Sequence, residues 1–318
     1  MIRTLRPTDV VAYLAFHNRA QDNGALDFPG DNPRSVTVKS FLSRSLSLDP
    51  RRESWVEVQD GRINGLVGVR GRLGTDFWDI DQLVADPADA EPIYVSLLRH
   101  LSRSACEEGV QKIFLRTTLD GAPANAAKLA GFVQYAVERI YRLSGSPPFD
   151  SLNDGLVQLR ARHRSDHHAI FHLYCSVVPV SVRQIEGMTM QEWRWTEGWG
   201  LRPPGWRMNL PRARRDFVFE KDDGVVAWLQ VRPRIPGLFL MLRPGDEADA
   251  EQILRFGISQ LGETSPIYVP IRQYQVGLEP FLQQIGFELA AEHALLTKTL
   301  TIRVAEPKVV PMRVHVSR

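Results

Sequence analysis

The chain has 318 residues, enough for two domains of ordinary size that each bury a core. It is 43% apolar and 24% charged, which is typical of a globular protein. Its 39 basic and 37 acidic side chains leave a net charge of +2, too small to indicate non-specific nucleic-acid binding.

Cysteine usage and the N-terminus bear on the compartment. Cys106 and Cys175 are the only cysteines, so no disulfide framework is expected and a reducing compartment is predicted. The N-terminal residues lack the apolar segment of a signal peptide, and no run of about 18 apolar residues could span a membrane. We therefore expect a cytoplasmic protein with neither nucleic acid nor a membrane as partner.

Patterns in the first half predict a mixture of strands and helices. Thr8 is the expected N-cap of the first helix, in which Val10, Leu14 and Asn18 are helically spaced. Asp60-Gly61 separates two strand-like runs and predicts a hairpin. The expected elements are a strand at 2–6, helices at 8–18 and 35–45, strands at 55–58, 63–70 and 77–85, a helix at 93–105 ending at Gly109, a strand at 113–117, a short helix ending at Gly131, and a last strand ending near Leu143.

The same order then restarts after a segment rich in proline, glycine and serine, which indicates a linker. We expect a first domain at 1–145, a linker at 146–155, a second domain at 156–302 and a basic tail at 303–318. The expected elements of the second half are a strand at 156–160, a helix capped by Ser165-Asp166, strands at 217–220, 225–231 and 238–242, a helix at 248–261, a strand at 267–271, a helix at 278–285 and a strand at 294–302.

An internal repeat supports this division. Leu129-Ala130-Gly131-Phe132 precedes an apolar strand, and Gln284-Ile285-Gly286-Phe287 does the same 155 residues later. So long a period indicates two whole domains of one fold.

Three features are informative in combination: the order β-α-α-β-β-β-α-β-α-β, the two Gly-Phe pairs, and the stretch Ile80-Asp81-Gln82-Leu83-Val84-Ala85-Asp86-Pro87. Together they resemble the GNAT superfamily of acyltransferases, and the order of elements does so twice. The resemblance covers nearly the whole chain. It implies an α+β (mixed α/β) fold of two GNAT-like domains, each a mixed, mostly antiparallel sheet flanked by helices.

The resemblance also implies a cofactor site. In that family the fourth strand splays from the fifth, and the pantetheine arm of acyl-CoA lies in the gap and pairs with strand backbone. The implied contacts for acetyl-CoA as co-substrate are the residues Leu83, Val84, Ala85 and Tyr94. The pyrophosphate would lie on a glycine-rich turn that opens the next helix, where free amides and the positive helix end attract an anion.

Both copies depart from the family at that turn. In the first copy no glycine is present, Pro92 lacks an N–H, and Asp89 and Glu91 bring carboxylates. In the second copy the acidic run 246–251 follows Gly245. A carboxylate about 5 Å from a phosphate charge costs roughly 1 to 3 kcal/mol, so the expected phosphate site is degenerate. Alternatively, these acids only cap the helices.

The catalytic groups implied by the resemblance are partly missing. The tyrosine that protonates the leaving thiolate is replaced by Ala127 and Leu282. The base on the fourth strand is matched by Asp81, with Asp79 on the same face by strand alternation. A pair of like charges would raise one pKa toward a useful range. The alternative is a solvated strand face, and the second copy has Leu238 at this position.

Two further segments contain residues suited to binding. His163, His167, His168 and His172 cluster around one helix, but no third ligand completes a metal site, and none is predicted. Residues 193–215 interleave tryptophan with arginine, which suits an anionic ligand, a protein partner, or a loop held in place by its tryptophans.

Three functions remain open. The first is an N-acyltransferase-like enzyme that moves an acetyl or acyl group from acyl-CoA to a small-molecule amine or a peptide. The second is a catalytically silent GNAT-fold protein that binds a small molecule or a partner. The third is a structural role, in which the domains share a continuous sheet or form a homo-oligomer.

Overall fold

The computed structural model describes residues 1–20, 23–26, 41, 51–72, 76–145, 158–187, 215–233, 236–262 and 265–301. Several expectations lie outside these residues. They are the helix at 35–45 apart from Phe41, the linker at 146–155, the tryptophan and arginine segment apart from Arg215, and the tail at 303–318.

Most elements of the first half lie where the sequence predicts them. The strands are β1 (Ile2–Thr4), β2 (Arg52–Gln59), β3 (Arg62–Gly71), β4 (Phe77–Ala85), β5 (Lys112–Thr118) and β6 (Val133–Leu143). The helices are α1 (Val10–His17), α3 (Ala90–Glu107) and α4 (Ala122–Leu129).

The second half repeats this order, and its helix α6 was missed by the sequence analysis. The strands are β7 (Arg160–Ala161), β8 (Arg215–Lys221), β9 (Gly224–Arg232), β10 (Gly237–Leu242), β11 (Ile267–Arg272) and β12 (Glu288–Thr299). The helices are α5 (His167–Val177), α6 (Val180–Glu186), α8 (Ala250–Ser259) and α9 (Glu279–Ile285).

Short-range signals account for the turns. Asp60 and Gly61 both have positive φ, 50° and 75°, as the predicted hairpin between β2 and β3 requires. Gly109 and Gly131 have φ of 78° and 86° and follow the ends of α3 and α4.

The first helix differs in detail from the expectation. Its buried residues are Tyr13 and Phe16, whereas Val11 is 76% exposed, because the two aromatic rings bury more apolar area than the smaller side chains. Thr8 makes no cap. Instead the Asp9 carboxylate accepts a hydrogen bond from the Arg6 N–H at 2.8 Å.

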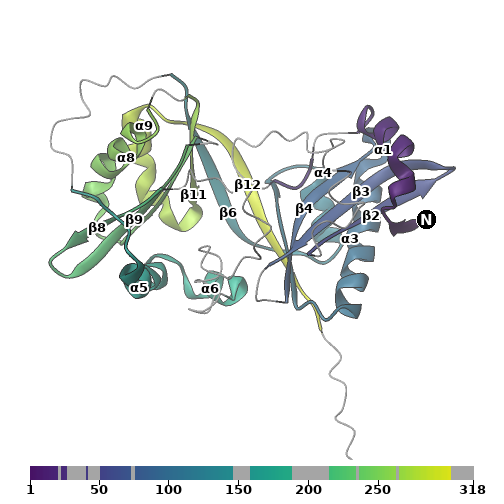
Figure 1. Cartoon of the computed structure of the whole chain (residues 1–318), viewed down its shortest axis with the longest axis horizontal. Helices are drawn as coiled ribbons and strands as arrows, with labels where there is room; N and C mark the ends of the chain where they lie inside the picture. The colour runs from purple at the N-terminus through teal and green to yellow at the C-terminus, as the bar shows by residue number, and fades with distance from the viewer. Residues whose placement is uncertain are drawn as a thin grey trace, which may run out of the picture.

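The described strands all join one twelve-stranded sheet, in the order β1-β2-β3-β4-β5-β12-β6-β11-β10-β9-β8-β7 (Figure 1). The sheet is mostly antiparallel. Among the strands that the structure describes, only β4 with β5, and β10 with β11, pair in parallel. The two halves run in opposite order away from the middle, where β6 and β12 lie side by side.

The last strand of each half lies in the sheet of the other half. β12 pairs with β5 over His293–Thr299, and β6 pairs with β11 over Glu138–Leu143. The exchanged strands also pair with each other. The two halves therefore share one continuous sheet, as the structural role considered above requires. The domain limits at 145 and 156 remain a prediction.

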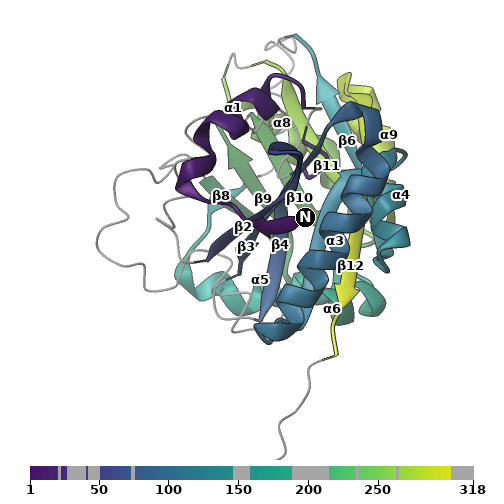
Figure 2. The ribbon, with the colours of Figure 1, turned by 90° about the vertical axis from the view of Figure 1, so that its right-hand side faces the viewer.

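Helices cover both faces of the sheet, with α3, α4 and α9 on one side and α1 and α5 on the other (Figure 2). One core lies under α3 and α4, and it includes Ala294, Leu296 and Leu300 from the end of the chain. Others lie under α8 and α9, under α1, and under α5 and α6. Within the described part of the chain, no helix is both long and apolar enough to cross a membrane.

Candidate functional site

The first candidate site is the gap between β4 and β5. The two strands pair only where Phe77–Asp79 lies beside Lys112–Phe114. β4 continues to Ala85 and β5 to Thr118 without further pairing to each other. Beyond Asp79, therefore, one edge of β4 has backbone groups that need other partners.

A short segment of the chain itself, Asn23–Leu26, supplies those partners. The Leu83 N–H donates to Asn23 Oδ1 at 2.8 Å, and the Gly24 N–H donates to the Leu83 carbonyl at 2.8 Å. Asn23 Nδ2 donates to the Asp81 carbonyl at 3.1 Å. On the opposite side of the gap, the Leu26 N–H donates to the Arg116 carbonyl at 2.9 Å. The segment thus bridges β4 and β5.

Of the residues predicted to contact acyl-CoA, Leu83 turns its backbone N–H and carbonyl to the gap, where they bond Asn23 and Gly24. The side chains of Leu83, Val84 and Ala85 are fully buried. Tyr94 is 1% exposed, and burial raises its pKa to about 12, opposed by a backbone hydrogen bond with Ala85.

The two predicted catalytic carboxylates are in different settings. Asp79 binds Arg72 through two hydrogen bonds of 2.6 and 2.8 Å, and that guanidinium lies 4.2 Å from the Phe114 ring centroid. Asp81 is the extra residue of a β-bulge, since Gly68 pairs with Gln82 and Val69 with Ile80.

The bulge also breaks the alternation on which the predicted pair depended. Trp78 and Ile80 face the core under α3 before the bulge, and Leu83 and Ala85 face it afterwards. Strand parity therefore changes at Asp81. Simple alternation therefore no longer predicts that Asp79 and Asp81 share a face of the sheet.

The turn before α3 contains the acidic residues expected from the sequence. Asp86 accepts a weak hydrogen bond of 3.4 Å from the Ala88 N–H and pairs with Arg19 at 3.4 Å. Among these acids, Glu91 also lines a groove on the outer side of α3.

In the second copy, a carboxylate of the chain itself occupies the corresponding turn. The Gly245 N–H donates to Glu247 Oε2 at 2.9 Å, at the turn where the resemblance would place a phosphate. Asp246 binds Lys221 and Arg243 at 2.5 and 2.6 Å, and both contacts lower the pKa of that carboxyl. These contacts hold the acidic turn together internally.

The gap of the second copy is also filled from within. β10 and β11 share only the pair Gly237 with Tyr268, and the Leu240 carbonyl accepts a hydrogen bond from Gln275 Nε2 at 2.9 Å. Leu238, which stands where the first copy has Asp81, is fully buried in the core. This copy presents no carboxylate at that position.

A second polar site, which we call the seam row, crosses the middle of the sheet. Arg272, Glu138, His293 and Thr118 lie opposite one another on β11, β6, β12 and β5. Glu138 Oε1 is 3.3 Å from both Arg116 Nη2 and Arg272 Nε. Because residues directly opposite on antiparallel strands point to one face, the row forms one polar strip. Glu138 and His293 are buried in its middle, whereas Thr118 is exposed at one end.

The strip continues into α6. Arg272 Nη1 donates to Glu186 at 2.8 Å, and the Tyr174 hydroxyl donates to the same carboxylate at 3.2 Å. Burial lowers the pKa of His293, against the opposing effect of Glu138. Among the described residues nothing bonds Glu138 Oε2 or His293 Nδ1. Tyr274, expected to pack, is partly buried beside Arg272.

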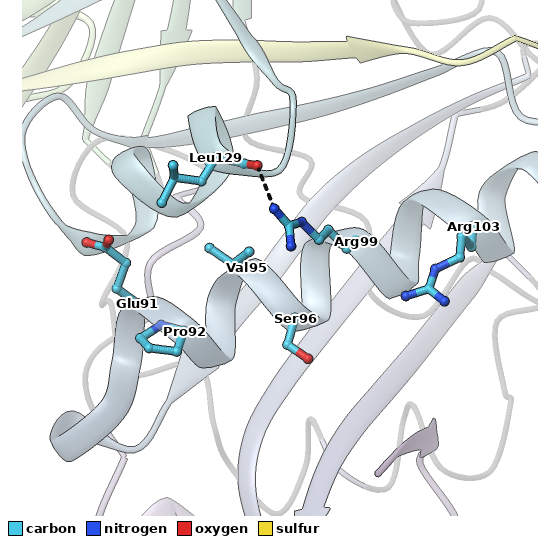
Figure 3. A pocket seen from close by; sticks show the side chains of 7 residues that line it. All are labelled: Glu91, Pro92, Val95, Ser96, Arg99, Arg103 and Leu129. Carbon is cyan, nitrogen blue, oxygen red and sulfur yellow. Dashed lines mark hydrogen bonds between the residues drawn. The ribbon is translucent and has the colours of Figure 1, made fainter.

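A groove of about 450 Å³ lies on the outer side of α3. It is lined by Glu91, Pro92, Val95, Ser96, Arg99, Arg103 and Leu129 (Figure 3). Arg99 donates to the Leu129 carbonyl at 3.4 Å across it. No residue of β4 or β5 lines this groove, so it is separate from the gap.

The histidines near α5 do not gather a metal site in the described part of the chain, where no group of three suitable ligands occurs. His168 and His172 are exposed and their ring centroids are 4.4 Å apart, as their spacing predicts. His167 Nδ1 lies 2.9 Å from Arg162 Nη2 instead.

Comparison with known proteins addresses the fold. No protein-family model matches the chain, and no curated protein matches its sequence. Among solved structures, a GCN5-related N-acetyltransferase from Sphaerobacter thermophilus superposes with a TM-score of 0.58 at 14% identity, covering 94% of this chain and 95% of that one. A tandem GNAT protein from the clavulanic acid biosynthesis pathway gives a TM-score of 0.52 at 14% identity, covering 94% and 98%.

The chain has a tandem GNAT fold. A candidate acetyltransferase from Pyrococcus horikoshii agrees, with a TM-score of 0.51 at 15% identity, covering 95% of this chain and 90% of that one. The fold class and the resemblance drawn from the sequence are therefore confirmed. At these identities the likeness concerns the fold, and function must be argued from the site.

The sequence analysis missed Asn23 and the seam row. Asn23 lies in a loop that the sequence marks only by its glycine, proline and aspartate content. Glu138 and His293 are 155 residues apart, and only the exchange of β6 and β12 brings them together. The repeat could have suggested that the last strands of the two copies are equivalent, but not that they are paired.

Proposed function

We propose that this tandem GNAT-fold protein is an acyltransferase that moves an acetyl or other acyl group from acyl-CoA to an amine. One observation carries the proposal, namely the gap that opens between β4 and β5 beyond Asp79. In the resembling family this gap holds the pantetheine arm. The first copy is the proposed site, because the second has Leu238 in place of a carboxylate.

The proposed roles follow the β4 edge. Leu83, Val84 and Ala85 would present backbone to the arm, and Tyr94 would support that edge from α3. The amine nitrogen would attack the thioester carbonyl, forming a C–N bond and breaking the C–S bond. Asp81 would take the amine proton, and the thiolate of coenzyme A would take a proton from water. Asp79 has its charge balanced by two bonds to Arg72, so it is given no part in the proton transfer.

The acceptor is proposed to be a small-molecule amine or a peptide, and the site is proposed to work without a tight pyrophosphate cradle. The acidic turns support this second point, since Asp89 and Glu91 adjoin the start of α3. Affinity for acyl-CoA would then depend on the arm more than on the phosphates, and it would be modest.

The test is thiol release from acetyl-CoA with a panel of primary amines. We expect saturable turnover by the full chain and a loss of at least about a hundredfold in kcat for Asp81→Asn, because a general base contributes roughly 10² to 10⁴. Asp223→Asn, at an exposed turn of the second copy, serves as the matched control and should leave turnover unchanged.

A catalytically silent protein that binds a small molecule or a partner is the second candidate. The observation that favours it is that both gaps and the second turn bond to the chain itself, through Asn23, Gln275 and Glu247. Absence of both thiol release and acetyl-CoA binding at millimolar ligand would select this candidate over the enzyme.

A further inference from the structure

The segment Asn23–Leu26 occupies the position that the proposed function assigns to the acyl-CoA arm. We propose that it is an internal latch, which must leave the β4–β5 gap before acyl-CoA can bind, so that acyl-CoA and the latch compete for the same backbone edge. This inference rests on the proposed function and concerns the regulation of the same site.

The latch bonds β4 through amide groups, as an amide-containing ligand would. The side-chain amide of Asn23 accepts from the Leu83 N–H and donates to the Asp81 carbonyl, at 2.8 and 3.1 Å. The Gly24 N–H adds a bond to the Leu83 carbonyl. A pantetheine arm has two secondary amides, which offer the same donors and acceptors to the strand. The latch and the arm therefore satisfy the same groups and exclude each other.

Packing shows that the latch fills the gap. Ala25 is 1% exposed and belongs to the core under α3 and α4. A Cβ added to Gly24 would lie 2.7 Å from Pro123 Cγ and 3.1 Å from the Leu83 carbonyl oxygen. Pro123 lies at the start of α4, so this position is closed from the helix side as well. With the latch in place, the space beside Gly24 is closed to another chain.

The latch also connects the gap to the seam row. Leu26 bonds the backbone carbonyl of Arg116, whose guanidinium contacts Glu138. Glu138 in turn contacts Arg272 of the second copy. An occupant of the gap thus adjoins a polar network that spans both halves of the molecule, which gives the second copy a physical route to influence the latch.

Opening the latch requires few bonds to break. Three of the hydrogen bonds of the latch involve the Asn23 side chain. One of them, 3.2 Å long and donated by the Ala25 N–H, holds the segment bent. A segment with few bonds opens locally without global unfolding. The apparent dissociation constant for acyl-CoA is then the intrinsic constant divided by the open fraction, and variants that open the latch should bind more tightly.

The experiment compares the full-length protein with two latch variants. Asn23→Ala removes the side-chain amide, and Gly24→Ala introduces the clash with Pro123. The matched controls are Asn64→Ala, where the side chain makes a solvent-exposed bond of 3.4 Å to Gln59, and Gly71→Ala, where the nearest atom to an added Cβ is 3.7 Å away. Hydrogen exchange at residues 23–26 and 81–85 reports opening, and calorimetry with acetyl-CoA and with free pantetheine reports binding.

We expect faster exchange at both segments in the latch variants, and an apparent Kd for acetyl-CoA and pantetheine that is lower by roughly tenfold or more. The controls should match the wild type. Wild-type protein that binds acetyl-CoA as tightly as the variants would overturn the latch and leave the proposed function standing. Faster exchange without binding of either probe would overturn the latch as a competitor. Tight binding of both probes by the variants, with no acyl transfer to any amine, would retain the latch and remove the acyltransferase.

Discussion

At the scale of single residues, the duplication of the chain is clearest in one ion pair. Arg3 binds Asp9 through two bonds of 2.7 Å, and Arg160 binds Asp166 through bonds of 2.7 and 2.8 Å. In each copy the same carboxylate accepts a backbone N–H three residues earlier. Each pair ties the first strand of its copy to the start of the first helix.

These pairs predict a pH dependence. Contacts with Arg3 and Arg160 lower the pKa of the Asp9 and Asp166 carboxyls, so the stabilisation is present above their unfolded value of about 4 and is lost as pH falls below it. We expect Asp9→Asn or Asp166→Asn to lower the free energy of unfolding by about 1 to 3 kcal/mol at pH 7, and by less as the pH falls below about 4.

Urea unfolding across pH measures this difference. Asp223→Asn, at an exposed pair with Arg243, should show a much smaller change. A loss that stays constant down to pH 2 or so would contradict the ionic origin of the stabilisation.

At the scale of elements, the exchange of β6 and β12 creates the seam row. Glu138 is 3% exposed and lies between two arginines, whereas Glu292 on the neighbouring strand binds Arg139 at 3.0 Å and is about one-third exposed. Paired carboxylates on these two neighbouring strands therefore differ in burial. A buried charge that loses its partner costs more than an exposed one.

The corresponding prediction compares these carboxylates. Glu138→Ala leaves Arg116 and Arg272 without a shared partner and should lower the free energy of unfolding by about 2 to 4 kcal/mol. Glu292→Ala should cost less than about 1 kcal/mol. Denaturant unfolding of both variants measures the difference, and equal losses would show that the seam row does not hold the halves together.

At the scale of the whole molecule, neither half completes its own sheet. Without β12, the long edge of β5 would have no partner and the core under α3 and α4 would lack Ala294, Leu296 and Leu300. Without β6, the long edge of β11 would likewise have no partner. The predicted domain limits therefore divide the chain at a place where the hydrogen-bonded sheet continues.

We expect a fragment of residues 1–145 to remain unfolded or aggregate, because an unpaired strand edge and missing core residues act together. Mixing it with the fragment 156–318 should restore folded protein. The full chain should unfold in one transition by calorimetry and circular dichroism. A soluble, cooperatively folded fragment 1–145 would contradict this account.

Local sequence determined much of this protein. The hairpin at Asp60-Gly61, strand β4 and helix α3 follow from turn chemistry and apolar patterns that act over a few residues. The repeated Gly-Phe pairs indicated two copies of one fold, and a resemblance indicated that this fold is GNAT-like. Only the tertiary structure decided that Asn23 bonds Leu83, that Glu247 fills its own turn, and that β6 and β12 change places. Those bonds join segments far apart in the chain, and a pattern of burial specifies which face of an element is covered but not which segment covers it.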